Sequence, residues 1–203
     1  MKKGRLEAFS DGVIAIIITI MVLELKVPHA VDWSTLAAVT PGLVSYVLSF
    51  VFVAIYWNNH HHLMQCVDRV NGGILWANCH LLFWLSLIPF VMGWIAENHF
   101  ATLPVALYGV VLLCAAIAYF ILVHSLIKLH GKDSLVAVAM GSDFKGKISV
   151  VVYAVAIPFA FLNPLWAFGL YVVVALMWLC PDPRVERTIA HWKSTDRPET
   201  AGE

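Results

Sequence analysis

Long apolar stretches, separated by short polar or glycine- and proline-containing breaks, make up most of the chain. The six stretches cover about residues 6–26, 39–63, 72–96, 103–128, 147–163 and 165–180. Each is close to the roughly 20 residues that cross about 30 Å of hydrocarbon. Because unpaired backbone groups are costly in lipid, we expect each stretch to be a helix. The pattern predicts an all-α membrane protein with one six-helix transmembrane domain over residues 1–180 and a short polar tail over 181–203.

Strands are a poor description of the same stretches. A membrane β-barrel needs segments of about ten residues in which apolar and polar side chains alternate. Runs such as 105–123 and 148–161 are instead apolar on all sides. The composition agrees with burial in a bilayer, since 61% of the 203 residues are hydrophobic and only 13% are charged. Soluble domains are about 45–50% apolar and about 25% charged.

The charges exclude some partners and predict an orientation. Thirteen Lys and Arg balance thirteen Asp and Glu, so the chain has no broad basic surface for nucleic acid. If the N-terminus lies in the cytoplasm, every Lys and Arg except Lys26 falls on the cytoplasmic side of the six predicted spans. This bias follows the positive-inside rule. It predicts a multi-pass cell-membrane protein with both termini in the cytoplasm.

No familiar catalytic or cofactor motif occurs in the chain. The sequence has no GxxxxGK[ST], HExxH or GxSxG, and no GxGxxG in a strand–helix setting. We therefore predict that the protein is not an enzyme and has no cofactor. The TVGYG filter of the usual potassium channels is also missing.

The first apolar stretch carries the most informative pattern. At 100° per residue, Ile16, Ile20 and Leu23 fall within about 60° of one another, with Thr19 at the edge of this stripe. Such a stripe is by itself typical of a lipid-facing or packed helix. Asp11 lies about 140° from Ile16 and, being costly to expose to lipid, is expected to face protein or water and to have a partner.

Three segments resemble prokaryotic members of the transmembrane protein 175 family. They are Arg5-x-x-x-Phe9-Ser10-Asp11 with Leu23–Pro28 at the end of the same helix, Tyr56–His61, and Asn78 with Leu85–Phe90. The resemblance covers about the first 90 residues, and the six-helix layout extends it over nearly all the rest.

This resemblance implies a homotetrameric, potassium-selective channel without a re-entrant pore loop, whose first helices line a central pore. It assigns a hydrophobic constriction and gate to Ile16, Ile20 and Leu23, with Thr19 supporting selectivity. It also implies a structural network of Arg5, Phe9, Ser10, Asp11, Trp57, His60 and Asn78. The expected partners are other copies of the chain and the lipid bilayer, with K⁺ as the permeant ion.

Several alternatives stay open at this stage. Glu24 either concentrates cations at the outer mouth or pairs locally with Lys26. Metal binding by the three histidines at 60–62 is disfavoured, because neighbouring helical side chains point about 100° apart. The rival functions are a proton- or cation-coupled transporter that uses Asp11 and His60, and a membrane enzyme or haem protein that uses His80 and His124.

Overall fold

The computed structural model describes residues 2–28, 31–141 and 143–179, and this part of the chain is helical without a strand. Its helices are α1 (Gly4–Leu23), α2 (Trp33–Gln65), α3 (Gly72–Ser86), α4 (Ile88–Glu97), α5 (Thr102–His130), α6 (Leu135–Met140), α7 (Phe144–Phe159) and α8 (Pro164–Leu179). The prediction of an all-α protein is confirmed. The predicted tail at 181–203 lies outside the described residues.

Four helical segments are long and apolar enough to cross a membrane. They are α1, α2, the segment Gly72–Glu97 that joins α3 and α4, and α5. The remaining two predicted spans coincide with α7 and α8, each with 16 described residues. Over the residues that the structure describes, all six apolar stretches therefore form helices.

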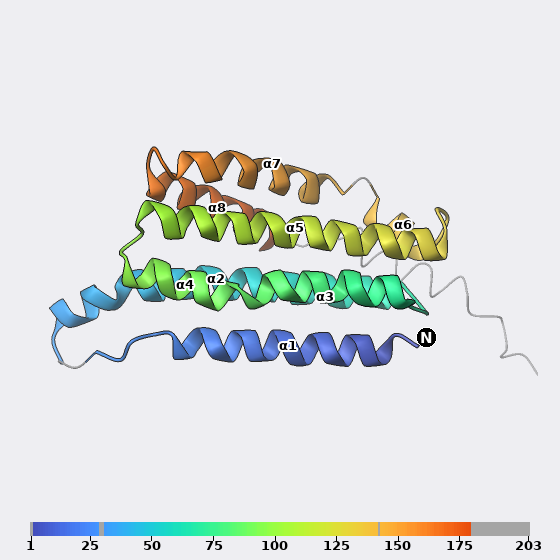
Figure 1. Cartoon of the computed structure of the whole chain (residues 1–203), viewed down its shortest axis with the longest axis horizontal. Helices are drawn as coiled ribbons and strands as arrows, with labels where there is room; N and C mark the ends of the chain where they lie inside the picture. Colours follow the sequence, from blue (N-terminus) through green and yellow to red (C-terminus); the bar gives the residue numbers. More distant parts are fainter. Residues whose placement is uncertain (1, 29–30, 142, 180–203) are drawn as a thin grey trace, which may run out of the picture.

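The structure differs from the predicted bounds at two prolines. The predicted helix at 72–96 is broken at Leu87, because Pro89 opens α4 and cannot donate the backbone hydrogen bond that would continue α3. The second predicted stretch begins at residue 39, whereas α2 begins at Trp33 and runs through Pro41. Figure 1 shows that the first turns of α2 are angled away from the rest of the helix, which is how a helix tolerates an internal proline.

A side-chain cap explains why α2 begins before Pro41. The Asp32 carboxylate accepts a hydrogen bond from the backbone N–H of Thr35 and another from the hydroxyl of Ser34, both at 2.7 Å. These bonds hold the pKa of the Asp32 carboxyl below its usual value, with the Thr35 N–H as the largest cause. A carboxylate in this position satisfies a backbone donor that the helix leaves unpaired.

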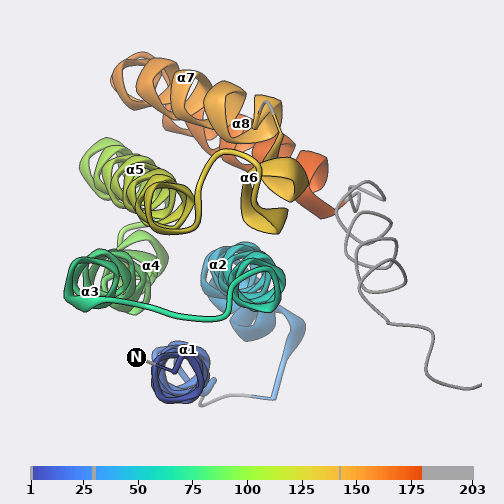
Figure 2. The ribbon, with the colours of Figure 1, turned by 90° about the vertical axis from the view of Figure 1, so that its right-hand side faces the viewer.

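The long helices run side by side along one axis, and α1 occupies an edge of the bundle (Figures 1 and 2). It packs mainly against α2, α3 and α4, whereas α5 lies centrally between α3 on one side and α7 on the other. The α7–α8 pair is at the side of the bundle opposite α1. As a result α1 has one face buried in the chain and another that no other described element covers.

Candidate functional site: the exposed face of the first helix

The two faces of α1 differ in chemistry. Its buried face, spaced three or four residues apart, packs on the neighbouring helices and consists of Leu6, Ser10, Ile14, Ile17 and Met21. The uncovered face carries small residues among the large ones, with Ala8, Gly12 and Ala15 all exposed. A β-carbon added at Gly12 would meet nothing within 4 Å. This face is therefore smooth enough for another helix to approach closely.

The apolar stripe predicted from helical spacing lies on the uncovered face. Ile16, Ile20 and Leu23 are 58%, 42% and 80% exposed. Thr19 is also exposed, and its hydroxyl donates a hydrogen bond to the backbone carbonyl of Ile16 at 2.8 Å. Because the hydroxyl proton is used within the helix, the oxygen of Thr19 presents lone pairs outward.

The stripe borders an open groove between α1 and the α3–α4 segment. The groove has a volume of about 630 Å³. Ile16, Ile17 and Ile20 form its α1 wall, while Phe90 and Trp94 of α4 line the other side. Its interior is thus mainly apolar and aromatic.

Glu24 and Glu97 lie at one end of this groove. The ammonium of Lys26 contacts the carboxylate of Glu97 at 2.9 Å, so the predicted alternative of a local Glu24–Lys26 pair is not what the structure has. The side chain of Glu24 lies over Gly93 instead, where a β-carbon would come within 2.9 Å of its Oε2. Glycine at position 93 therefore makes the room that the Glu24 carboxylate occupies.

A buried hydrogen-bond chain joins α1, α3 and α2. The hydroxyl of Ser10 donates to the carbonyl of Leu6 at 2.8 Å and accepts from Nδ2 of Asn78 at 2.9 Å. This fixes the amide of Asn78, whose Oδ1 lies 2.8 Å from Nε2 of His60. Nε2 must then carry the proton, because an amide oxygen can only accept. Ser10, His60 and Asn78 are each at most 1% exposed.

The same hydrogen-bond network does not include the other ring nitrogen of His60, Nδ1. Among the described residues, Nδ1 of His60 makes no hydrogen bond. The directions of the bonds therefore run one way, from His60 through Asn78 and Ser10 to the Leu6 carbonyl. Because these side chains are buried from water, their hydrogen bonds link α1, α2 and α3.

A second, more exposed set of contacts lies beside the first. The indole of Trp57 donates to Asp11 at 3.0 Å and stacks on the ring of His61. His61 in turn lies 3.5 Å from Glu7 and within hydrogen-bond distance of Gln65. Sequence reasoning missed Glu7, although it precedes Asp11 by four residues and so shares its side of the helix.

The structure does not bring Arg5 and Phe9 into these contacts. Phe9 is 57% exposed, and Arg5 is exposed on the same side of α1 as Ile16, eleven residues and about 20° away. The helix is unbroken from Gly4, so the start of α1 does not turn Arg5 away from this side. Of the predicted network, the structure joins Ser10, His60 and Asn78 in one group and Asp11 and Trp57 in another.

No cluster of three metal-ligating side chains occurs among the residues that the structure describes. Of the histidines considered as ligands, His60 faces Asn78 and His61 faces Glu7 and Gln65. His80 accepts a hydrogen bond from the indole of Trp84 in the same helix. These three imidazoles have different hydrogen-bond or ion-pair partners and do not converge on a common metal site.

Comparison with known proteins gives consistent matches. The family model described as "Endosomal/lysosomal potassium channel TMEM175" matches residues 5–89. A potassium channel of Chryseobacterium sp. (strain P1-3) is 54% identical over 189 residues, which is 93% of this chain and 98% of that protein. An endosomal/lysosomal proton channel TMEM175 of Danio rerio is 27% identical over 132 residues, covering 63% of this chain but only 24% of that protein.

A solved structure is similar over almost its whole length. The crystal structure of a lysosomal potassium-selective channel TMEM175 homolog from Chamaesiphon minutus aligns with a TM-score of 0.73 at 28% sequence identity. The alignment covers 87% of this chain and 96% of that one. The matched proteins are ion channels and not enzymes.

Proposed function

Since the chain belongs to the TMEM175 family, we propose that it is a potassium channel whose subunits assemble as a homotetramer around a pore lined by α1. One observation carries the assignment of the pore to α1. This helix is at the edge of the bundle, and its uncovered face presents Ile16, Ile20 and Leu23 in line with Thr19. Four copies meeting at this face would enclose a narrow apolar channel.

The chemistry of the stripe supports a gate more than a binding site. A ring of isoleucine side chains has no oxygen to replace the hydration shell of an ion, so it acts through its radius and by deciding whether water wets the constriction. A closed ring at Ile16 would expel water and stop ions. In the open state K⁺ passes with part of its water, and the outward lone pairs of Thr19 offer oxygen beside the constriction.

The outer mouth is assigned to Glu24, one residue beyond the stripe. Its carboxylate occupies the space that the absence of a side chain at Gly93 leaves, and the nearby ammonium of Lys26 pairs with Glu97. Lys26 is therefore paired with Glu97 and not with Glu24. Four such carboxylates at a pore entrance raise the local concentration of cations.

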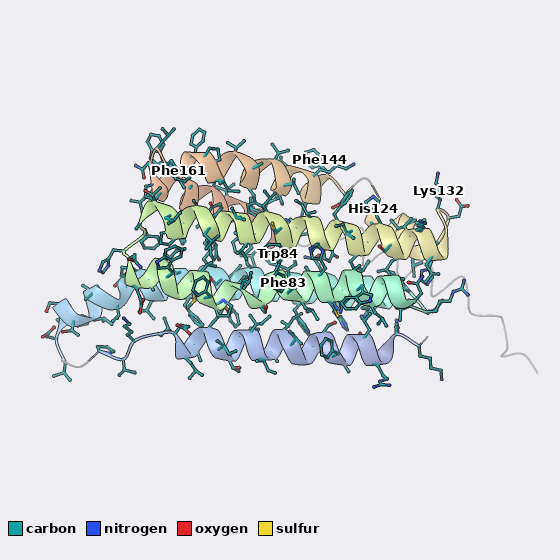
Figure 3. All side chains as sticks on the ribbon, viewed as in Figure 1. Phe83, Trp84, His124, Lys132, Phe144 and Phe161 are labelled. Atoms are coloured by element: carbon teal, nitrogen blue, oxygen red, sulfur yellow. The ribbon has the colours of Figure 1, made fainter. Side chains whose placement is uncertain are left out.

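The proposed topology has six spans, formed by α1, α2, α3 with α4, α5, α7 and α8. In this arrangement both termini face the cytoplasm, as the distribution of Lys and Arg predicts. Lys2 precedes α1, Lys132 follows α5 and Lys147 lies in the first turn of α7, all toward one end of the bundle, whereas Lys26 follows α1 at the other end. Figure 3 labels Lys132 at the first of these ends and Phe161 at the opposite one.

The rival transporter mechanism requires a proton to pass between Asp11 and His60. Asp11 instead accepts from the indole of Trp57, and the protonated nitrogen of His60 faces Asn78. The hydroxyl proton of Ser10 is committed to a backbone carbonyl. These contacts favour a structural role for the two groups of residues over a proton relay.

The pore assignment is tested by substituting the stripe and recording single channels in planar bilayers. Ile16→Asn is expected to raise the open probability and conductance, because an amide ring stays wet. Thr19→Val, which removes the oxygen at constant shape, is expected to lower K⁺ over Na⁺ selectivity measured from reversal potentials.

Matched controls exist for both substitutions. Thr40→Val removes a hydroxyl of α2 that likewise bonds a carbonyl of its own helix. Val22→Asn puts an amide on α1 about 120° from Ile16. Both controls should leave conductance and selectivity unchanged. If Ile16→Asn and Thr19→Val are also without effect in channels that conduct K⁺, α1 does not line the pore.

A further inference from the structure

A second cavity lies on the side of the bundle away from α1. It has a volume of about 530 Å³ and is enclosed by α2, α5 and α7, with Trp178 of α8 also on its wall. Ligand pockets in proteins have volumes of about 300–1,000 Å³. No residue of α1 lines it, so it is separate from the proposed ion path.

The inner part of this cavity is aromatic. Phe52 and Tyr153 are buried side chains in edge-to-face contact, and both line the cavity. Tyr56 and Tyr119 add a second edge-to-face pair to the wall. The hydroxyl of Tyr119 donates to the carbonyl of Asn59, so the polar atom of that ring already has its partner. The interior therefore offers apolar ring surface and few free polar groups.

The cavity opens sideways between α5 and α7. Its exposed lining residues are Ile117 and Phe120 on α5 and Lys147 and Val151 on α7. These positions fall in segments that we assign to the membrane, so the opening faces acyl chains and not water. Figure 3 labels His124 on α5 and Phe144 at the start of α7.

The polar groups of the cavity gather at one side of the opening, where α7 begins. Asp143 caps α7 by accepting from the backbone N–H of Gly146 at 3.2 Å, and Lys147 follows one turn later. Lys145, close by, lies over the ring of Trp178, whose indole donates to Ser149. The exposed Lys147 therefore places an ammonium group at this side of the opening.

We propose that the cavity binds one acyl chain of an anionic phospholipid from the leaflet at the basic end of the bundle, with the phosphate at the ammonium of Lys147. The apolar inner part of the cavity holds the acyl chain, and the ammonium of Lys147 at the opening binds the phosphate of the headgroup. The inference depends on the membrane placement of α5 and α7 but not on which helix lines the pore.

Native mass spectrometry of the full-length channel in detergent, titrated with phosphatidylglycerol, tests this site. Ala116→Phe places a ring in the cavity and is expected to abolish one binding event per chain. Lys147→Gln is expected to weaken that event about fivefold, since a basic residue near an anionic lipid surface contributes about 1 kcal/mol. Lys132→Gln removes a basic residue from the loop after α5 and is the matched control that should bind as the wild type does.

A second readout covers the case in which Ala116→Phe does not fold. Phosphatidylglycerol with a brominated acyl chain should quench the fluorescence of Trp178, measured as the difference between the wild type and Trp178→Phe. Lys147→Gln should reduce this quenching, and Lys132→Gln should not. Phosphatidylcholine should quench less than phosphatidylglycerol does.

Three results would overturn the proposal. Equal binding by the wild type and a folded Ala116→Phe would mean that the lipid binds elsewhere on the protein and not in this cavity. Equal binding by Lys147→Gln and Lys132→Gln would remove the assigned headgroup contact. Equal quenching by the anionic and zwitterionic lipids would contradict the preference for an anionic headgroup.

Discussion

Replacing Asn78 by leucine is the sharpest test of the buried chain that joins α1, α2 and α3. Leucine has the same number and branching of side-chain heavy atoms, with bulkier terminal groups, so the change removes polar contacts and leaves little empty space. It deprives Ser10 of a donor at 2.9 Å and the Nε2–H of His60 of an acceptor at 2.8 Å. No described residue offers Nδ1 of His60 a bond that would compensate.

The expected loss follows from the burial of these groups. An unpaired buried polar group costs about 1–3 kcal/mol in water-soluble proteins. Hydrogen bonds between membrane helices contribute less, about 0.6 kcal/mol on average and at most about 1.7. Two lost bonds therefore predict a destabilisation of about 1–3 kcal/mol. For a chain of this length that corresponds to a fall in melting temperature of about 2–12 °C.

The assay is the melting temperature of the detergent-solubilised protein, followed by the loss of its monodisperse peak in size-exclusion chromatography. Asn98→Leu is the matched control, because the amide of Asn98 is exposed and bonds only the carbonyl of Trp94 in its own helix. Ser10→Ala and the double variant Ser10→Ala/Asn78→Leu complete a double-mutant cycle. The expected interaction free energy between the two residues is about 0.6–1.7 kcal/mol. Equal melting temperatures for Asn78→Leu and Asn98→Leu, or strictly additive single effects, would refute the reasoning.

Three further changes test separate parts of the structure. Glu97→Gln removes the carboxylate that pairs with Lys26, so that Lys26 can neutralise Glu24 instead. The K⁺ conductance at low salt should then fall toward that of Glu24→Gln, and an unchanged conductance would contradict this. Asp11→Ala deletes the acceptor that ties α1 to α2, and size-exclusion chromatography should show loss of the oligomer before selectivity changes; a stable tetramer with altered selectivity argues the opposite. Gly109→Ala should destabilise the protein by about 1–3 kcal/mol, because its methyl group would overlap the hydroxyl of Tyr171. An unchanged melting temperature would mean that the tyrosine moves aside without cost.

The helices of this protein could be predicted from sequence because a run of apolar residues in lipid has few alternatives to a helix. The bounds were less predictable, because caps and prolines compete there. Asp32 starts α2 before Pro41, and Pro89 divides a segment that hydropathy alone describes as continuous. The six-residue α6 was not predicted, since so short a helix has no periodicity of its own.

The candidate site was predictable to the extent that it depends on one helix. The spacing of Ile16, Ile20 and Leu23 gives their common face, and the structure leaves that face uncovered. Contacts between helices were not predictable in the same way. The partner of Lys26 is Glu97, seventy-one residues away, and Glu7 meets a histidine of α2. Such pairs depend on how the helices are rotated and shifted against one another, which the periodicity of a single helix does not determine.

In the proposed six-span arrangement, the unequal lengths of the helices give the two flanks of each subunit different hydrophobic thicknesses. With 16 residues, α7 is about 24 Å long, against about 30 Å of hydrocarbon in an average bilayer. In this arrangement the bilayer beside α7 must thin, while beside α1 and α2 it keeps its ordinary depth. Longer acyl chains in the surrounding lipid would therefore strain one flank of each subunit and leave the other relaxed, which couples the tilt of α7 to membrane thickness.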